Sequence, residues 1–475
     1  MIRSLFTLLL LASTLRAEPP NVVVILADDL GWGDVSSYNP ESKIQTPAID
    51  SLAATGIKFG DGHSNSSVCT PTRYGILTGR YAWRSRLKRG VLNGSSPTLI
   101  EPDRPTIASV LKEGGYHTAC LGKWHLGLDW QKDGKKVDFT QPIQRGVNEA
   151  GFDYFLGIAA SLDMPPYALI ENNTITQDLD QKHSGTRGLD FTRPGAKSSE
   201  FEFIDYLPGL AKSATAYISE RAKSDQPFFL YLPLPSPHKP VIPAKEFQGK
   251  SGIGPYGDYV VETDWAVAQV IDALKASGEL DNTLIIFTSD NASFAIPESY
   301  GVVQQGHQPN AHFRGQKTDA YEGGHRVPFI VSWPAQLKPG TSDEVICTTD
   351  IMATALAAAD LKMPSGAGED SYDFLPHLKG AKSKPVREAT IHHSINGTFA
   401  IRKGPWKFIE GKGSGGRTKV PADSPKIQLY HLIDDPSEAR EIHAQHSEIV
   451  KELQALLERY RQQPSSLPKR SPSSP

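Results

Sequence analysis

The chain has 475 residues, of which 39% are hydrophobic and 22% are charged, and its formal net charge at pH 7 is -3. These values are typical of a globular protein, and they exclude a disordered, collagen-like or multi-span membrane chain. Because the charge balance shows no basic excess, nucleic acid is not expected as a partner. Three cysteines exclude a disulfide framework, since at most one pair can form and one thiol is left over.

The first 17 residues have the layout of a secretory signal peptide. Arg3 gives a positively charged n-region, residues 5–12 form a short apolar stretch, and Ala17 is a small residue before the expected cleavage site. An N-terminal strand or a buried helix is the alternative for this segment. No later stretch reaches the roughly 20 apolar residues of a membrane helix, so stable membrane insertion is not expected. We therefore expect an exported protein, which is periplasmic, secreted or lumenal depending on the host.

Short apolar runs alternate with helical patterns up to about residue 375. Continuous apolar runs are typical of strands buried on both faces, and their alternation with helices indicates an α/β sheet layered by helices. In chain order, the pattern predicts strand 21–27, helix 48–55, helix 106–114, strand 116–121, helix 210–223, strand 227–232, helix 258–277, strand 283–288 and strand 328–333.

The pattern changes after residue 375. Four short runs rich in β-formers and one helical pattern predict a small sheet with one helix, and no internal repeat is visible. These elements are expected at 390–393, 398–401, 406–409, 428–432 and, for the helix, 447–462.

The predicted domain organisation has four parts. The Pro- and Ser-rich composition from Pro464 onward favours disorder in the last part. The parts are a signal peptide over residues 1–17, a large α/β catalytic domain over 18–375, a small sheet-plus-helix domain over 376–463 and a disordered tail over 464–475.

Two pairs of oxygen-bearing side chains follow expected buried strands. Asp28 and Asp29 come directly after the first strand, and Asp290 and Asn291 follow the strand at 283–288. Ligand sites in open α/β sheets form at the carboxyl ends of the strands. Three carboxylates and an amide suit Ca²⁺ or Mg²⁺ rather than a soft metal. A solvated acidic loop is the alternative for either pair alone.

Cys69 begins the segment Cys-Thr-Pro-Thr-Arg, and Leu-Thr-Gly-Arg follows at 77–80. A plain cysteine nucleophile would need a neighbouring base, and a small buried apolar residue is the ordinary alternative. Together the two segments resemble the signature of the type I sulfatases, in which the cysteine is oxidised to formylglycine. The family has Ser, Ala or another small residue where Thr72 stands, whereas its strongest fixed points, Pro71 and Arg73, are present.

Further segments are similar to the family's other motifs and occur in the same order, so the resemblance covers roughly residues 20–440. It implies an alkaline-phosphatase-like fold, with a large mixed sheet layered by helices and a small C-terminal antiparallel sheet with one helix. The matching segments are 122–127, 151–157, 237–240, 313–317 with 322–328, and 429–432 with 434–438.

The resemblance implies a sulfuric ester hydrolase that releases inorganic sulfate from a sulfated carbohydrate or an aryl sulfate. It also implies Ca²⁺, in preference to Mg²⁺, as the cofactor. Formylglycine requires a maturation enzyme, which is therefore an expected partner. The implied metal ligands are Asp28, Asp29, Asp290, Asn291 and an oxygen of the converted Cys69.

The resemblance further implies the catalytic roles. The hydrated aldehyde presents two hydroxyls, of which one attacks sulfur and displaces the alcohol. His125 takes a proton from the second hydroxyl, which expels sulfate and regenerates the aldehyde. Arg73 and Lys123 orient and stabilise the diol. His238 and Lys317 hold sulfate and support the departing oxygen as acid.

Three residues are expected to contact the substrate. Ser161 is a candidate for a hydrogen bond to sulfate, and His312 stands five residues before the catalytic lysine. Asp163 lies in the polar stretch 161–201, which is long for a connection and is expected to form a wall of the substrate site. Other residues of this stretch that can touch sugar are His183, Arg187 and Arg193.

Two alternative functions stay open at this point. The first is a phosphodiesterase or phosphonate monoester hydrolase of the same superfamily, some members of which also carry formylglycine; the segment around Lys317 and the closing turn favour a sulfatase. The second is a secreted glycan-binding protein without turnover, which an unmodified thiol at Cys69 would favour. The intact set of acids, bases and metal ligands argues against such a binder.

Overall fold

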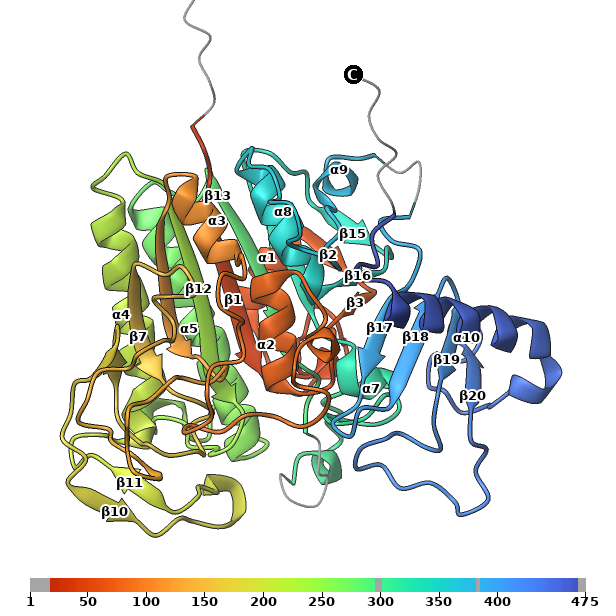
Figure 1. The fold of residues 1–475 in the computed structure, drawn as a ribbon, viewed down its shortest axis with the longest axis horizontal. Helices are drawn as coiled ribbons and strands as arrows, with labels where there is room; N and C mark the ends of the chain where they lie inside the picture. The colour runs from red at the N-terminus through yellow and green to blue at the C-terminus, as the bar shows by residue number, and fades with distance from the viewer. Residues whose placement is uncertain (1–17, 295–300, 382–384, 469–475) are drawn as a thin grey trace, which may run out of the picture.

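The structure is a computed structural model that describes residues 18–294, 301–381 and 385–468 (Figure 1). The expected signal peptide at 1–17 lies outside the described residues. Within the described ranges, no helix has the length and apolar character needed to cross a membrane.

A ten-stranded mixed sheet forms the centre of the molecule. Its five inner strands run parallel, and antiparallel pairings occur only toward its two edges. In spatial order the strands are β15 (Gly340–Ser342), β2 (Ile57–Phe59), β14 (Phe329–Ser332), β13 (Thr283–Ser289), β1 (Asn21–Asp28), β12 (Phe228–Pro237), β4 (His117–Lys123), β7 (Tyr154–Ile158), β8 (Ile170–Glu171) and β9 (Thr174–Ile175).

Helices cover both faces of this sheet because its central strands are apolar on both faces. In β1, Val22 and Val24 belong to one buried core, whereas Val23 and Ile25 belong to the other, since successive side chains of a strand point to opposite faces. The first core includes α2 (Cys69–Thr78), α3 (Ile107–Glu113) and α8 (Ile351–Ala358), and the second includes α1 (Pro47–Thr55), α4 (Tyr206–Arg221) and α5 (Pro255–Ala276) (Figure 1).

A separate four-stranded antiparallel sheet follows in the chain, and α10 (Ser447–Gln462) packs against it (Figure 1). Leu453 and Leu457 of the helix share a buried cluster with Ile401 and Phe408 of the sheet. The predicted fold class is therefore confirmed. The strands are β17 (Thr390–His393), β18 (Phe399–Lys403), β19 (Trp406–Ile409) and β20 (Gln428–His431).

A buried ion pair joins the small sheet to a short helix of the preceding α/β part. Lys407 of β19 lies 2.9 Å from a carboxylate oxygen of Glu322, in α7 (Glu322–His325), and 2.9 Å from one of Glu438. All three side chains are buried. Because an unpaired buried charge is strongly destabilising, these pairs fix the C-terminal sheet against the segment that follows Lys317.

The expected disorder does not hold for the first residues after Pro464. The hydroxyl of Tyr372 donates to the carbonyl oxygen of Ser466 over 2.7 Å, and the backbone N–H of Ser466 donates to Asp370 Oδ1 over 3.2 Å. These hydrogen bonds fix the segment around Ser466 against the α/β part, although the composition of this segment alone predicts a disordered tail. Residues 469–475 lie outside the described residues. The domain boundary after residue 375 stays a prediction.

Candidate active site

The two predicted pairs of oxygen ligands meet at one edge of the sheet. Strands β1 and β13 are parallel neighbours, with Ala27 beside Ser289, so they end together. The backbone N–H of Asp29 donates to Asp290 Oδ1 over 3.3 Å, and Asn291 Nδ2 donates to Asp29 Oδ1 over 2.7 Å. The carboxyl-end rule for α/β sheets thus places these residues correctly.

A turn at the end of β1 brings its two acids to the same side. Asp29 has φ of 64°, in the left-handed region that Asp tolerates better than most residues. Neighbouring side chains of a straight strand would point apart. Instead, potential ligand atoms of Asp28, Asp29, Cys69 and His238 all lie within 4.8 Å of one another.

Cys69 is the first residue of α2, and its side chain faces these acids. Its sulfur lies 3.7 Å from Asp28 Oδ1 and 3.3 Å from Lys317 Nζ. Burial, and then the charge of Asp290, raise the pKa of the thiol to about 12. An unmodified Cys69 is therefore a protonated thiol at neutral pH, which disfavours plain thiolate chemistry at this site.

Three buried cations pair with the three carboxylates, so the formal charges of these six side chains balance. Pairs this short in a protein interior hold each group in a fixed position. The hydrogen bonds run from Lys123 Nζ to Asp28 Oδ2 over 2.6 Å, from Lys317 Nζ to Asp29 Oδ1 over 2.6 Å, and from Arg73 Nε and Nη2 to Asp290 Oδ2 over 3.0 and 2.7 Å.

The donor set fits a hard divalent cation. Asn291 Oδ1 is buried and has no hydrogen-bond partner among the described residues, although its amide nitrogen is bonded to Asp29. An unpartnered buried oxygen is costly, and amide and carboxylate oxygens are the ligands that Ca²⁺ prefers. Burial opposes ionisation of Asp28, but the charge of Lys123, followed by those of His238 and Arg73, holds its pKa below the usual value.

His125 is held as a neutral imidazole. Its Nε2 lies 2.8 Å from the carbonyl oxygen of Leu92, so Nε2 carries the hydrogen, while the buried Nδ1 has no partner among the described residues. Burial, and then the charges of Lys123 and Arg73, lower its pKa well below the ordinary value. A neutral ring whose hydrogen is on Nε2 has its acceptor lone pair on Nδ1.

His238 presents its other ring nitrogen to the acids. Its Nδ1 lies 2.5 Å from the carbonyl oxygen of Lys239 and 3.1 Å from Ser161 Oγ, and its Nε2 lies 3.7 Å from Asp29 Oδ2. The structure thus places Ser161, expected as a sulfate contact, against the histidine ring. From there it orients His238.

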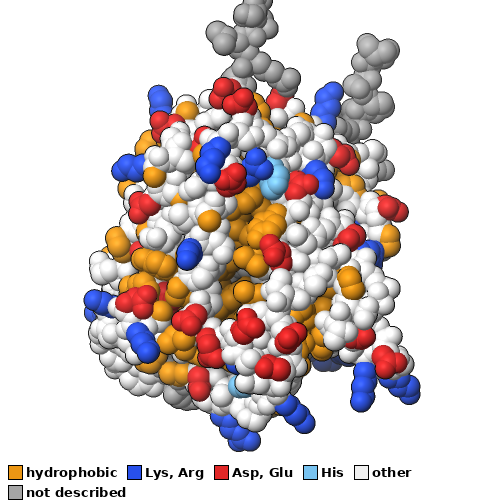
Figure 2. Space-filling model, turned by 90° about the vertical axis from the view of Figure 1, so that its left-hand side faces the viewer, with side chains coloured by type: hydrophobic (Ala, Val, Ile, Leu, Met, Phe, Trp, Pro, Cys, Tyr) orange, Lys and Arg blue, Asp and Glu red, His pale blue; other side chains and the backbone are white. Residues whose placement is uncertain are grey.

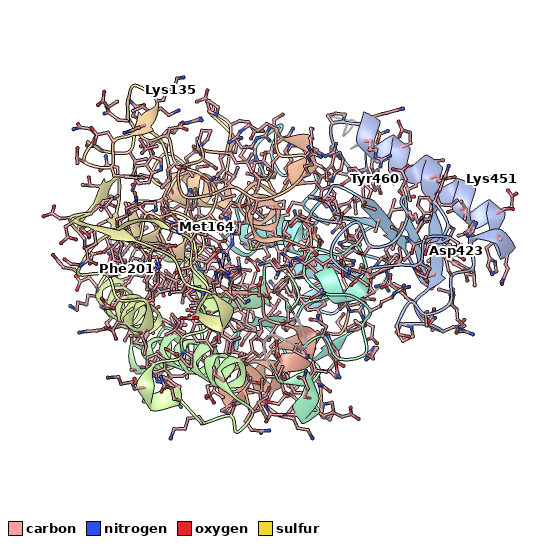
Figure 3. All side chains as sticks on the ribbon, turned by 90° about the horizontal axis from the view of Figure 1, so that it is seen from below. Lys135, Met164, Phe201, Asp423, Lys451 and Tyr460 are labelled. Atoms are coloured by element: carbon pink, nitrogen blue, oxygen red, sulfur yellow. The ribbon has the colours of Figure 1, made fainter. Side chains whose placement is uncertain are left out.

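Cys69, His125, His238 and Lys317 line a cavity of about 350 Å³, at the lower end of ligand-pocket sizes. Met164 also lines this cavity. Figure 3 shows the molecule from below, with the carboxyl ends of the parallel strands toward the viewer and Met164 labelled among them.

The three predicted substrate contacts have different positions. Asp163 lines the cavity and is buried, and its Oδ1 has no hydrogen-bond partner among the described residues. His312 does not line the cavity. Its ring packs against Trp32 and Phe313, with centroids 6.1 and 4.2 Å away, and its contact with substrate stays a prediction.

Three residues that line the cavity were not predicted from the sequence. Lys239 lies within a recognised motif without an assigned role, and Phe294 follows the second acidic pair. Arg417 lies in the Gly-rich stretch 411–419 of the C-terminal part, whose composition predicts only a loop.

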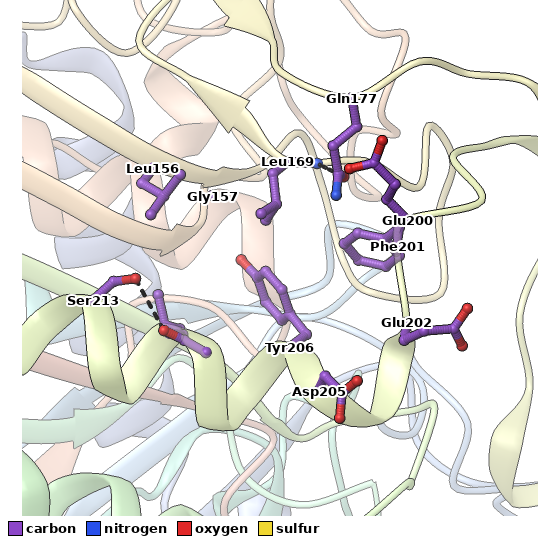
Figure 4. A pocket seen from close by; sticks show the side chains of 12 residues that line it. Leu156, Gly157, Leu169, Gln177, Glu200, Phe201, Glu202, Asp205, Tyr206 and Ser213 are labelled. Carbon is purple, nitrogen blue, oxygen red and sulfur yellow. Dashed lines mark hydrogen bonds between the residues drawn. The ribbon is translucent and has the colours of Figure 1, made fainter.

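A second cavity, of about 220 Å³, lies beside β7 and α4 (Figure 4). On the face shown in Figure 2, hydrophobic side chains lie in a hollow, with both acidic and basic side chains around it. The charged residues that line the second cavity are Glu200, Glu202 and Asp205. No lysine or arginine among its lining residues offsets these carboxylates, so this cavity is unsuited to sulfate.

Comparison with known proteins agrees with this geometry. A family model described as Sulfatase matches residues 20–361, and one described as N-sulphoglucosamine sulphohydrolase, C-terminal, matches residues 313–463. N-acetylgalactosamine-6-O-sulfatase of Bacteroides thetaiotaomicron is 35% identical, over 93% of this chain and 93% of that protein. Arylsulfatase A of Homo sapiens is 35% identical, over 91% of this chain and 85% of that protein.

Solved structures show the same relationship. A Bacteroides thetaiotaomicron structure, described under the metabolism of multiple glycosaminoglycans, is 32% identical with a TM-score of 0.84, and the match covers 94% of this chain and 100% of that one. A phosphonate monoester hydrolase of Agrobacterium radiobacter shares the fold, at 19% identity and a TM-score of 0.61 over 93% and 96% of the chains.

The fold and the site define a hydrolase that acts on esters of a tetrahedral anion. The chain belongs to the sulfatase family and is a sulfuric ester hydrolase. The family and the enzyme class predicted from the sequence motifs are both confirmed.

Proposed function

We propose that this protein is a formylglycine- and Ca²⁺-dependent sulfatase that releases inorganic sulfate from a sulfated sugar. The observation that carries the proposal is the convergence of Cys69, Asp29 and Lys317 in one cavity. The unpartnered Oδ1 of Asp163 at this cavity is suited to accept a hydrogen bond from a sugar hydroxyl. A relative named for N-acetylgalactosamine 6-sulfate makes that sugar the first substrate to test.

The cofactor and the modified residue belong to this proposal. When bound, Ca²⁺ would supply positive charge for the sulfate oxygens, and formylglycine made from Cys69 by a maturation enzyme would supply the nucleophile. The side chains that would hold the cation are Asp28, Asp29, Asp290 and Asn291.

The chain's own residues place charges and protons around the sulfate. Lys317 Nζ lies between Asp29 and Cys69, where it can bind a sulfate oxygen next to position 69. His125 Nδ1 is placed to accept a proton during sulfate release. His238 Nδ1 donates its hydrogen to the carbonyl oxygen of Lys239, so Nε2 faces the site; as the doubly protonated ring, His238 would give its Nε2 proton to the departing alcohol oxygen.

Export is a separate proposal, supported by the signal-peptide pattern over residues 1–17. N-terminal sequencing of protein recovered from outside the cytoplasm is expected to start at residue 18. An intact N-terminus on such material would contradict it.

A substrate panel tests the proposed reaction. Purified protein whose aldehyde at position 69 has been verified is assayed on N-acetylgalactosamine 6-sulfate, other sugar sulfates, an aryl sulfate and matched phosphate and phosphonate esters. Inorganic sulfate and phosphate are measured by ion chromatography. Faster turnover of a sugar sulfate than of every phosphorus ester supports the proposal. Faster turnover of a phosphorus ester, or binding without turnover, contradicts it and selects one of the two alternatives.

A further inference from the structure

The mouth of the catalytic cavity carries cations that the sulfate centre does not use. At the centre, each lysine or arginine pairs with a carboxylate of the proposed metal site. The other charged lining residues, histidines aside, are three cations and one acid: Arg193, Lys239, Arg417 and Asp163. Arg193 Nε lies 3.2 Å from Asp163 Oδ2, whereas Arg417 has no ion-pair partner in the part of the chain that the structure describes.

Arg417 is held in place by its backbone. Its N–H donates to Asp319 Oδ1 over 2.8 Å and lies 3.1 Å from Thr318 Oγ1. A Cβ at Gly416 would lie 2.4 Å from the same Asp319 oxygen, so only glycine allows this close approach. Because Thr318 directly follows Lys317, the Arg417 segment is fixed beside the catalytic lysine.

The side chain of Arg417 lies at the open rim of the cavity. It is exposed, and its guanidinium carbon lies 4.7 Å from the ring centroid of Phe294, which also lines the cavity. Burial lowers the pKa of Lys239 and the charge of Arg417 lowers it further, whereas the charges of Asp163 and Asp29 raise it. An anion bound near Lys239 and Arg417 would reduce the repulsion between these two cations.

We propose that the cavity mouth is a second anion subsite, in which Arg417, together with Arg193 and Lys239, binds a carboxylate or a second sulfate carried within one sugar unit of the sulfate that is hydrolysed. This inference rests on the sulfatase function proposed above. An arginine fork binds either group through two parallel hydrogen bonds. The substrate class is therefore a sulfated sugar with a neighbouring anion, such as a sulfated hexosamine linked to a uronate.

Matched substrates separate this subsite from general attraction of anions. The panel contains a sulfated hexosamine, its disaccharide with a uronate, the same disaccharide with the carboxyl reduced to an alcohol, and a disulfated hexosamine. Values of kcat/KM are measured at one low ionic strength for the wild type, Arg417→Gln, Arg417→Lys and Lys419→Gln. The last variant removes the same charge from the same segment but from an exposed residue that does not line the cavity.

We expect the wild type to prefer an anion-bearing substrate over its neutral counterpart by about tenfold or more, mainly through KM, because hydrogen bonds to charged groups are worth about that much. Arg417→Gln is expected to bring this ratio close to one, Arg417→Lys to restore part of it, and Lys419→Gln to keep it. If the Arg417-dependent preference appears between the uronate disaccharide and its reduced form, the second anion is a carboxylate. If it appears between the disulfated and the monosulfated hexosamine, the second anion is a sulfate.

Two results would overturn the subsite. One is a wild type that hydrolyses sugar sulfates with no preference for either second anion. The other is an Arg417→Gln variant whose loss is equal on every substrate, which indicates general steering or a structural role. A wild type with verified aldehyde that hydrolyses none of these sulfate esters overturns the proposed function as well, and this outcome is distinct from the other two.

Discussion

Lys317 donates a hydrogen bond to the sulfur of Cys69 over 3.3 Å, which joins residues 248 positions apart in the chain. The same ammonium lies 2.6 Å from Asp29 Oδ1. Burial works against its charge, but Asp29 and Cys69 raise the pKa of Lys317 well above the ordinary value. A fixed positive charge therefore stands against position 69, where the proposed nucleophile forms.

We expect Lys317→Met to lower kcat by about 10²–10³-fold, because it removes a fixed charge from the water-poor site in which charge develops on sulfate. Lys317→Arg should retain more activity than Lys317→Met. Steady-state kinetics on a sugar sulfate measure the effect, and circular dichroism with thermal unfolding checks that the variant folds. Exposed Lys338→Met is the matched control. A folded Lys317→Met with near-wild-type kcat would show that this charge is not used.

Asp290→Asn is expected to lose bound Ca²⁺ and activity together, because the variant replaces a carboxylate of the oxygen donor set with a neutral amide. Metal content is measured by mass spectrometry after dialysis, with exposed Asp281→Asn as control. In the wild type, a strong chelator should abolish activity and added Ca²⁺ should restore it. Unchanged metal content in folded Asp290→Asn would reject Asp290 as a ligand, and full activity in chelator after exhaustive dialysis would reject the metal site.

His125→Ala should slow sulfate release more than alcohol release. The buried Nδ1 without a described partner is the proton acceptor in the proposed second half of the reaction, and loss of such a base typically costs about 10²–10⁴-fold in rate. Single-turnover alcohol release and steady-state sulfate release are compared in aldehyde-bearing protein. Equal slowing of both would contradict this role for His125.

Glu262 makes the stability of the fold depend on pH. It is buried in α5, its Oε2 accepts a hydrogen bond from the N–H of Ala244, and its Oε1 has no partner among the described residues. Burial raises its pKa to about 8, from an ordinary value of 4.5. The folded protein therefore keeps a proton that the unfolded chain releases. This contribution to stability is fully present below pH 4.5 and is lost as the pH rises to about 8.

Glu262→Gln is accordingly expected to gain thermal stability relative to the wild type as the pH rises from about 5 to about 8. Unfolding temperatures of the two proteins are compared across this range, beside exposed Asp272→Asn of the same helix. A difference that stays constant with pH, or that shrinks as the pH rises, would show that Glu262 does not bind the extra proton.

The positions of the residues of the proposed metal site were predictable because one rule of sheet geometry governs them. The apolar runs before Asp28 and Asp290 mark buried parallel strands, and such strands place their carboxyl ends side by side. The helix that carries Cys69 was not predicted. All residues of α2 are buried, so the segment shows no polar face and no clear helical period.

The stretch 161–201, expected as a wall of the substrate site, supplies Asp163, Met164, Phe191 and Arg193 to the lining of the cavity. His312 was expected at the substrate from its spacing to Lys317. The structure shows its packing against Trp32 and Phe313, which the spacing did not predict, and its contact with substrate stays a prediction. Arg417 reaches the cavity because Asp319 binds its backbone across 98 positions of sequence. A contact of this kind depends on tertiary structure, so the sequence of the Gly-rich stretch does not predict it.

The most direct test of the proposed mechanism is the chemical state of residue 69 measured together with turnover. Mass spectrometry of the peptide that contains Cys69 gives the fraction of aldehyde in several preparations, and ion chromatography gives the rate of sulfate release from the best sugar sulfate. We predict that the rate rises in proportion to the aldehyde fraction and that Cys69→Ala releases no sulfate while it remains folded. A preparation with only unmodified thiol, or the Cys69→Ala variant, that releases sulfate at the rate of aldehyde-bearing protein would contradict the account.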